Sequence, residues 1–236
     1  MQRDALKVAD ECYADYVNPF IGTDFTGNTY PGAQVPFGMV QLSPDNGLPG
    51  WDRISGYFYP DSTIAGFSHT HLSGTGAGDL YDISFMPVTL PYKEAEEPLG
   101  IHSRFSHADE SASAGYYRVL LKDYDINVEL TATERCGIQR YTFPQADAAV
   151  ILNLRKAMNW DFTEDSYVEK VDSVTIQGYR FSDGWARGQR IFFRTRFSRP
   201  FETMRLDSAA VLKDGKRIGT SVMARFDFKT TKGEQL

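Results

Sequence analysis

The sequence predicts an all-β protein, built as a large antiparallel two-sheet β-sandwich with little helix. Apolar and polar residues alternate in "INVELTA" (126–132) and in "VMARFDF" (222–228), which is the pattern of half-buried strands. Strand-like segments recur roughly every ten residues and leave no gap long enough for a crossover helix. This spacing favours an antiparallel sandwich over a fold of alternating strands and helices.

The N-terminal part is expected to differ from the sandwich. Helical periodicity is confined to Asp4–Tyr16, so residues 1–16 are expected to form an extension with at most one short helix, ahead of a sandwich domain at 17–236. From Asn18 to Asp52 the chain is dense in glycine, proline and aromatic residues, which predicts long structured loops between short strands. Loops held on a rigid scaffold commonly carry function.

The remaining strands are predicted from composition and turn signals. Segments rich in β-branched and aromatic residues are typical of strands; they are "YYRVLLKD", "CGIQRYTF", "DAAVILNL", "DSVTIQGYRF" and "RIFFRTRF". The stretch "LKDGKR" (212–217) predicts a hairpin, because an Asp-Gly pair favours a tight turn between strands.

Composition excludes several classes of protein. The 236 residues carry a net charge of −6 with acids and bases interspersed, so no basic surface for nucleic acid is expected. No apolar run approaches the ~18 residues of a membrane span. The N-terminus lacks the apolar core of a signal peptide, which leaves a cytosolic protein or an absent signal open. Cys12 and Cys136 show no metal-ligand spacing, and whether they pair is open.

The stretch "GFSHTHLSGTGAGD" (66–79) is the most unusual in the chain. On a strand His69 and His71 would share one face, and Asp79 follows after a glycine-rich turn. Two histidines and a carboxylate can hold a metal, but a metal site needs three convergent ligands and only the two histidines are close in the sequence, so no metal site is assigned to this chain. Neither a phosphate-binding loop nor a nucleophile elbow matches. The structural alternative is a tight turn whose histidines bond to backbone.

A tryptophan beside an aspartate is the second candidate site. Trp51 lies in "GLPGWD", where it can be a core residue or can stack on the apolar face of a sugar, and Asp52 can accept hydrogen bonds from hydroxyl groups. Asp45, in "LSPDNG", is expected to form a turn. The pair Trp160–Asp161 repeats the combination of ring and carboxylate. Among 31 acidic residues, sequence alone selects no catalytic acid–base pair.

Several longer stretches together resemble one family. They are "NPFIGT", "TYPGAQVPFGMVQLSPD", "SGYFY", "GFSHTHLSGTGAGD", "FSHADESASAGYYRVLL", "ELTATERCGIQRYTFP" and "GWARGQRIFFRTRFSRPF", and they occur in this order. The chain from about Val17 to Phe228 resembles the N-terminal domain of glycoside hydrolase family 92, the calcium-dependent exo-α-mannosidases.

This resemblance implies a sandwich of the supersandwich type that precedes a C-terminal (α/α)6 catalytic barrel, absent from this chain. It implies hydrolysis of terminal α-mannose from glycans with inversion, in a bacterial enzyme that is secreted or periplasmic. The catalytic acid, the catalytic base and most ligands of Ca2+ are expected in the barrel, so this chain is expected to hold no catalytic residue and to be inactive by itself. Its partners are expected to be that barrel and α-mannosides.

The resemblance also implies site residues in this chain. Trp51 matches a position that lines the mannose pocket, and the "SHTH" stretch with His69 and His71 matches one near the domain junction; with Asp52 these are the expected substrate-binding residues. Asn28, Ala77 and Gln139 depart from the residues frequent in relatives, which leaves the cleaved linkage open. A free-standing carbohydrate-binding module and a purely structural sandwich remain the alternatives.

Overall fold

A computed structural model describes residues 12–74, 76–96, 99–155, 160–206, 211–213, 216–220 and 222–236. Its regular structure consists of antiparallel strands and three short 3-10 helices, η1 (Tyr13–Tyr16), η2 (Trp51–Arg53) and η3 (His107–Asp109). Of the helix expected over Asp4–Tyr16, only the part from residue 12 onward lies in the described residues, where Tyr13–Tyr16 form the 3-10 helix η1. No helix in the described ranges is long and apolar enough to cross a membrane.

The largest sheet has six strands in the order β1-β3-β4-β10-β17-β14. The central strand β10 pairs with β4 on one side and with β17 on the other, and its residues from Ala148 to Leu152 are buried on both faces. The strands are β1 (Ser43–Asp45), β3 (Gly66–Ser68), β4 (Ser84–Thr89), β10 (Ala146–Asn153), β17 (Met223–Thr230) and β14 (Thr203–Leu206).

A five-stranded sheet in the order β18-β9-β8-β7-β6 has one face in the core and one facing outward. The alternation predicted for 126–132 is confirmed, because Ile126, Val128 and Leu130 are buried while the residues between them are not. The strands are β6 (Glu110–Ser113), β7 (Tyr116–Leu121), β8 (Ile126–Ala132), β9 (Gly137–Phe143) and β18 (Glu234–Gln235).

The third sheet has the order β13-β12-β11-β16-β15. The hairpin predicted at 212–217 is confirmed in its strands, which pair with one another, while its turn lies outside the described residues. The strands are β11 (Phe162–Lys170), β12 (Thr175–Asp183), β13 (Gln189–Arg196), β15 (Val211–Lys213) and β16 (Lys216–Gly219). A small fourth sheet pairs β2 (Thr63–Ile64) with β5 (Ser103–Arg104).

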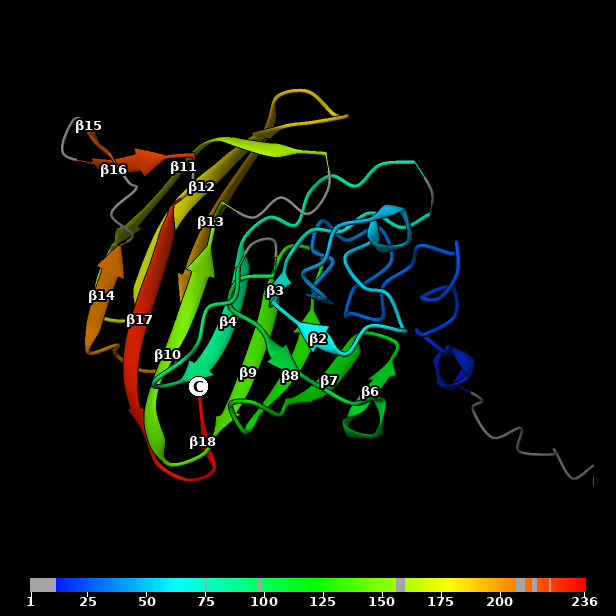
Figure 1. The fold of residues 1–236 in the computed structure, drawn as a ribbon, viewed down its shortest axis with the longest axis horizontal. Coiled ribbons are helices and arrows are strands. Elements are labelled where there is room, and N and C mark those ends of the chain that lie inside the picture. The colour runs from blue at the N-terminus through cyan, green and yellow to red at the C-terminus, as the bar shows by residue number, and fades with distance from the viewer. Residues whose placement is uncertain are drawn as a thin grey trace, which may run out of the picture.

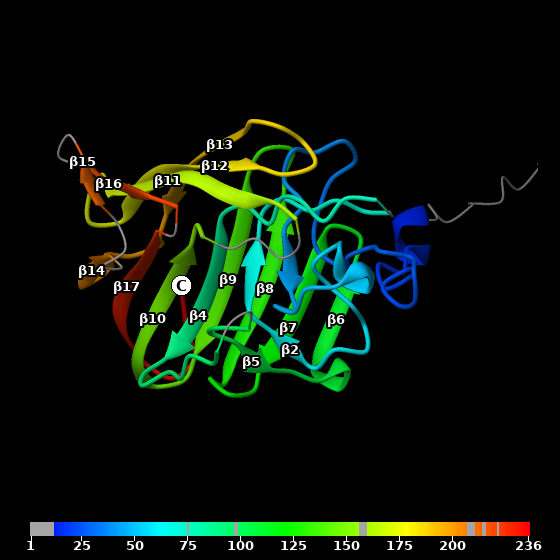
Figure 2. The ribbon, with the colours of Figure 1, turned by 45° about the horizontal axis from the view of Figure 1, so that its top comes forward.

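The predicted antiparallel all-β class is confirmed, and the number of sheets is the difference from the expectation. Within the described residues the strands form four hydrogen-bonded sheets, where two were expected. Long twisted sheets tend to split, and a break in register between Thr163 and Asp165 interrupts β11. In Figures 1 and 2 the loops of the first ninety residues, in blue and cyan, gather over the end of the molecule that contains β6–β8.

A buried arginine ties the third sheet to the segment that precedes β4. Arg180 on β12 is 1% exposed and donates to Asp82, at 2.7 Å, and to Asp161, at 2.8 Å. Because burial opposes ionisation more strongly than Arg180 favours it, the pKa of Asp161 is raised to about 6. One Asp161 oxygen has no partner among the described residues, which fits a carboxyl group that is protonated readily.

Asp161 makes the stability of the domain depend on pH in a defined direction. In the unfolded state the pKa of Asp161 is near 3.8, so Asp161 ionises in the unfolded state at a lower pH than in the folded state. The stability that Asp161 contributes is therefore lost as the pH rises from about 4 to 6. We expect the stability deficit of Asp161→Asn relative to the unsubstituted protein to shrink from pH 4 to pH 7 by up to about 3 kcal/mol.

Urea unfolding at several pH values measures this change. Asp172→Asn is the control, because a backbone N–H at Val174 lowers the pKa of Asp172, so the contribution of Asp172 changes mainly below pH 4 and stays nearly constant from pH 4 to pH 7. An Asp161→Asn deficit that is constant across this range would contradict the assignment.

Candidate functional site

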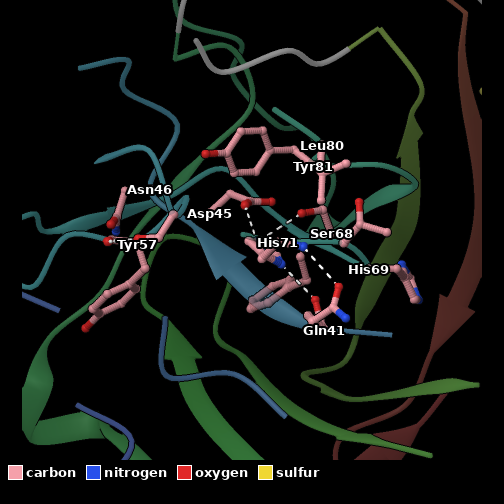
Figure 3. Close-up of polar contacts among 12 residues, drawn as sticks. Gln41, Asp45, Asn46, Tyr57, Ser68, His69, His71, Leu80 and Tyr81 are labelled. Carbon is pink, nitrogen blue, oxygen red and sulfur yellow. Dashed lines mark hydrogen bonds and ion pairs between the residues drawn. The ribbon is translucent and has the colours of Figure 1, made fainter. Parts of the chain in front are cut away.

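The two histidines of "SHTH" lie in different surroundings. The chain leaves β3 at Ser68, so His69 and His71 do not share a strand face. The His71 ring lies in a buried cluster with Asp45, Tyr30 and Tyr81. Figure 3 shows the His69 ring pointing away from His71 and Asp45. The expectation that both histidines face one site is therefore wrong, because it assumed that the strand continues through them.

His71 is held on every side. Its side chain and that of Asp45 are fully buried, with 2.8 Å between Nε2 and Oδ1, and its Nδ1 lies 2.7 Å from the carbonyl oxygen of Gln41. The Nδ1–H therefore donates to that carbonyl. The rings of Tyr30 and Tyr81 flank the imidazole at centroid distances of 5.1 and 5.6 Å. A ring enclosed in this way positions its neighbours and does not reach solvent.

Asp45 was expected to form a turn, and the structure shows that this was wrong. It is the last residue of β1 and has no exposed surface. The local sequence "SPDNG" is typical of a turn, whereas the role of Asp45 comes from a histidine far along the chain. A sequence signal for the strand was present, because apolar and polar residues alternate in "VQLS" just before Asp45. Val40 and Leu42 are buried and Gln41 is less so, which indicates an extended segment.

The cluster supports the turn that carries Trp51. The Tyr81 hydroxyl donates to the Ile54 carbonyl, directly after η2. Arg53 within η2 makes a two-pronged ion pair with Asp61, at 2.6 and 2.5 Å. This pair raises the pKa of Arg53, chiefly through the hydrogen bond. The turn is thereby held by Tyr81 on its buried side and by Asp61 through Arg53.

Gly56 lets the backbone approach the cluster. Its φ is +89°, and a Cβ there would lie 2.7 Å from Asp45 Oδ1 and 3.0 Å from His71 Cδ2. Only glycine fits both the left-handed conformation and this distance. The segment that follows the glycine-rich turn is strained as well, because Leu80, Tyr81 and Ile83 have positive φ values. Such strain persists only where surrounding contacts fix the backbone, and it is concentrated at functional sites.

Trp51 forms an exposed aromatic surface with a second tryptophan. Trp51 is 52% exposed and Trp160 is 47% exposed, and their rings meet edge to face at 5.8 Å. The interpretation of Trp51 as a core residue is therefore wrong, and its predicted partial exposure is confirmed. Trp160 was noted in the sequence only as another ring beside an aspartate. We call these two side chains the tryptophan pair; Asp52 lies next to it, half-buried.

Other apolar side chains of the first ninety residues are exposed too. Phe25 is 80% exposed at a φ of 51°, and Phe37 is fully exposed at a φ of 60°. Large exposed apolar residues in loops of unfavourable backbone conformation are typical of surfaces that contact a partner.

Asp79 does not join the histidines. It is 1% exposed and accepts a hydrogen bond from the backbone N–H of Ala186, between β12 and β13, at 2.9 Å. No group of three histidine, cysteine, aspartate or glutamate side chains is placed to hold a metal in the described part of the chain. Cys12 and Cys136 are free and exposed.

Comparison with known proteins gives this geometry a context. A family model described as "Glycosyl hydrolase family 92 N-terminal domain" matches residues 16–236. An uncharacterized secreted glycosidase of Arthroderma benhamiae is 29% identical over 140 residues, which is 56% of this chain and 18% of the relative.

Solved structures agree with the family model. A family GH92 α-mannosidase of Bacteroides thetaiotaomicron, in complex with mannoimidazole, matches with a TM-score of 0.87 and 38% identity over 95% of this chain. A family GH92 inverting mannosidase of the same species, strain VPI-5482, matches with a TM-score of 0.72 and 26% identity over 94% of this chain. This chain spans only 31% and 30% of those two proteins. The chain belongs to glycoside hydrolase family 92, as an N-terminal domain of that family.

Proposed function

We propose that this chain is the non-catalytic N-terminal domain of an exo-acting α-mannosidase that removes terminal α-mannose from glycans with inversion. Its contribution is a wall of the substrate pocket, made by the tryptophan pair. Exposure of two adjoining indole rings on a rigidly held turn is the observation that carries this proposal. The printed descriptions of the solved relatives, an α-mannosidase and an inverting mannosidase, support the substrate and the stereochemistry.

Each expected site residue then has a separate role. Trp51 and Trp160 offer flat apolar surface that packs on a sugar ring and excludes water from one side. Asp52 follows Trp51 in the same turn, and its carboxylate can accept hydrogen bonds from sugar hydroxyls. His71 acts through Asp45 and Tyr81 on the turn that carries Trp51, and His69 lies outside the tryptophan pair, in a groove described below.

The reaction itself is assigned to a C-terminal catalytic domain of the same polypeptide. Inversion needs a general acid and a general base about 6.5–9.5 Å apart on opposite sides of the scissile bond. Calcium belongs to the proposal for the longer enzyme, where it would polarise groups of the bound sugar. Most of its ligands are proposed to belong to the catalytic domain. The secreted relative supports an extracytoplasmic enzyme.

A free-standing carbohydrate-binding module is the second candidate, favoured by the fact that the tryptophan pair is complete within this domain. Calorimetric titration of the isolated chain with mannose and mannobiose separates the two functions. Saturable binding at millimolar or lower concentration supports a module, whereas half of an exo-acting pocket holds no sugar on its own.

We expect the isolated chain to release no mannose from α-mannosides, with or without added calcium. The pair of catalytic carboxyl groups that inversion requires is assigned to the missing domain. Release of reducing sugar from mannobiose is the measurement, with the full-length enzyme as the positive control. Calcium-dependent turnover by the purified 236-residue chain would overturn the division of labour.

In the full-length enzyme Trp51→Ala is expected to lower kcat/KM by one to two orders of magnitude, or roughly 1.4–2.8 kcal/mol of transition-state binding. Its melting temperature should change little, because the ring is about half exposed. Trp185→Ala is the matched control, since that ring is 77% exposed and belongs to no described ring pair. Equal losses of activity in the two variants would remove the special role of Trp51.

Gly56→Ala tests whether the cluster behind Trp51 positions the ring. The added methyl group meets Asp45 and His71, so we expect about 2–4 kcal/mol of destabilisation. In protein that remains folded, kcat/KM for α-mannosides should fall. Gly74→Ala is the control, because its φ of +88° imposes similar backbone strain with no atom within 4 Å. If both variants lose the same stability and activity, contact with the cluster is irrelevant.

A further inference from the structure

A groove of about 770 Å³ lies apart from the tryptophan pair, between β9 and β13. Its floor includes His69, Ile83 and Phe85 from the six-stranded sheet and the residues that lead into it, and the end of the chain, Gln235 and Leu236, lines it as well. The groove is thus enclosed by strands from three sheets.

One wall of the groove is a strand edge that is only partly paired. Tyr141 on β9 and Leu236 exchange two backbone hydrogen bonds, at 2.9 and 3.0 Å. Backbone groups that face this side recur every second residue, so Gln139 and Gly137 present theirs to the same side. Among the described residues, neither has a backbone partner there, because pairing with the C-terminal strand stops at Tyr141.

The opposite wall is β13, which lies at the edge of its sheet. Its side chains alternate between half-buried and exposed along the whole strand. Ile191 and Phe193 pack against the core, whereas Phe192 is 68% exposed. An unpaired strand edge with exposed apolar side chains readily accepts another strand.

The groove carries a charge opposite to that of the chain as a whole. Its lining includes Arg135, Arg140, Arg194 and Arg196 and, among the described residues, no aspartate or glutamate. Only Arg140 has an ion pair in the described structure, with Glu129. His69 adds no positive charge, because burial lowers its pKa and its Nδ1–H donates to Ile83 O at 2.7 Å. An occupant with carboxylate side chains and an extended backbone complements this lining.

We infer that the polypeptide that follows Leu236 continues β18 along β9 and occupies this groove. This rests on the proposed function, in which further chain follows the N-terminal domain. The second residue after Leu236 would pair with Gln139 and the fourth with Gly137, in the same antiparallel register. Its outward side chains meet the arginines, and its apolar ones cover Ile191 and Phe193. The link between the domains is then a strand of this sandwich and not a free tether.

Thiol labelling of the full-length enzyme tests occupancy. Cys136 lines the groove and is exposed in this domain, as is Cys12 outside it. With each rate normalised to that in denatured protein, alkylation of Cys136 should be on the order of tenfold slower than that of Cys12. Arg194→Glu/Arg196→Glu should restore the reactivity of Cys136. Arg190→Glu is the control, because it changes charge on the same strand outside the groove lining. The contacts that it removes, an exposed ion pair with Glu164 and the stacking of the guanidinium on Phe181, lie away from the groove.

A photo-reactive phenylalanine analogue at Phe192 identifies the occupant in the same full-length protein. A cross-link to the residues directly after Leu236 is the expected result. A cross-link to another segment or to a second copy, or rapid alkylation of Cys136 in the intact protein, overturns the inference. Mannosidase activity measured on the same sample keeps the two proposals separate. An active enzyme with an open groove contradicts only the strand, and an inactive one contradicts the proposed function.

Discussion

The hydrogen bond between His71 and Asp45 is the interaction on which the functional end of the molecule depends. Both side chains are fully buried, 2.8 Å apart, and the second ring nitrogen is bonded to the Gln41 carbonyl. Burying such groups is costly unless each finds its partner, and loss of one partner leaves the other uncompensated. The pair therefore specifies one arrangement of the end of β1, the segment before it and the stretch after β3. Loops of this length are ordered because they converge on a shared polar centre.

The strands were predictable because their signal is local. The alternation of apolar and polar residues over 126–132 coincides with β8, because the polarity of each side chain there matches the face of the strand on which it lies. The Asp-Gly pair at 214–215 in the sequence predicted the pairing of β15 with β16 for the same reason. Division into four sheets was not predictable, because it depends on which edges meet after the strands twist. The six-stranded sheet brings β10 between β4 and β17, a connection between distant parts of the chain.

The candidate site was predictable only in part. Trp51 stood out because a large ring in a glycine- and proline-rich loop has few structural uses. Its contact with Trp160 joins opposite halves of the chain, and no local pattern encodes such a contact. Asp45 was assigned to a turn because its neighbours favour one, although its partner lies 26 residues away. The histidines were taken as one pair because the strand was assumed to continue past Ser68. Each difference arises where tertiary contacts override local preference.

The stretch 66–79 connects the two surfaces to which functions are assigned. His69 lies on the floor of the groove, His71 fixes the cluster behind Trp51, and Asp79 accepts a hydrogen bond from the connection between β12 and β13. Directly after it, Asp82 is paired with Arg180, so the third sheet is attached to the same segment. Packed interiors transmit displacement with little loss, because they contain few voids. A polypeptide in the groove and a sugar against the tryptophan pair therefore contact one rigid body. A rigid N-terminal domain can keep its half of a pocket in place while another domain supplies the other half. Such a pocket keeps its shape only if neither half moves relative to the other.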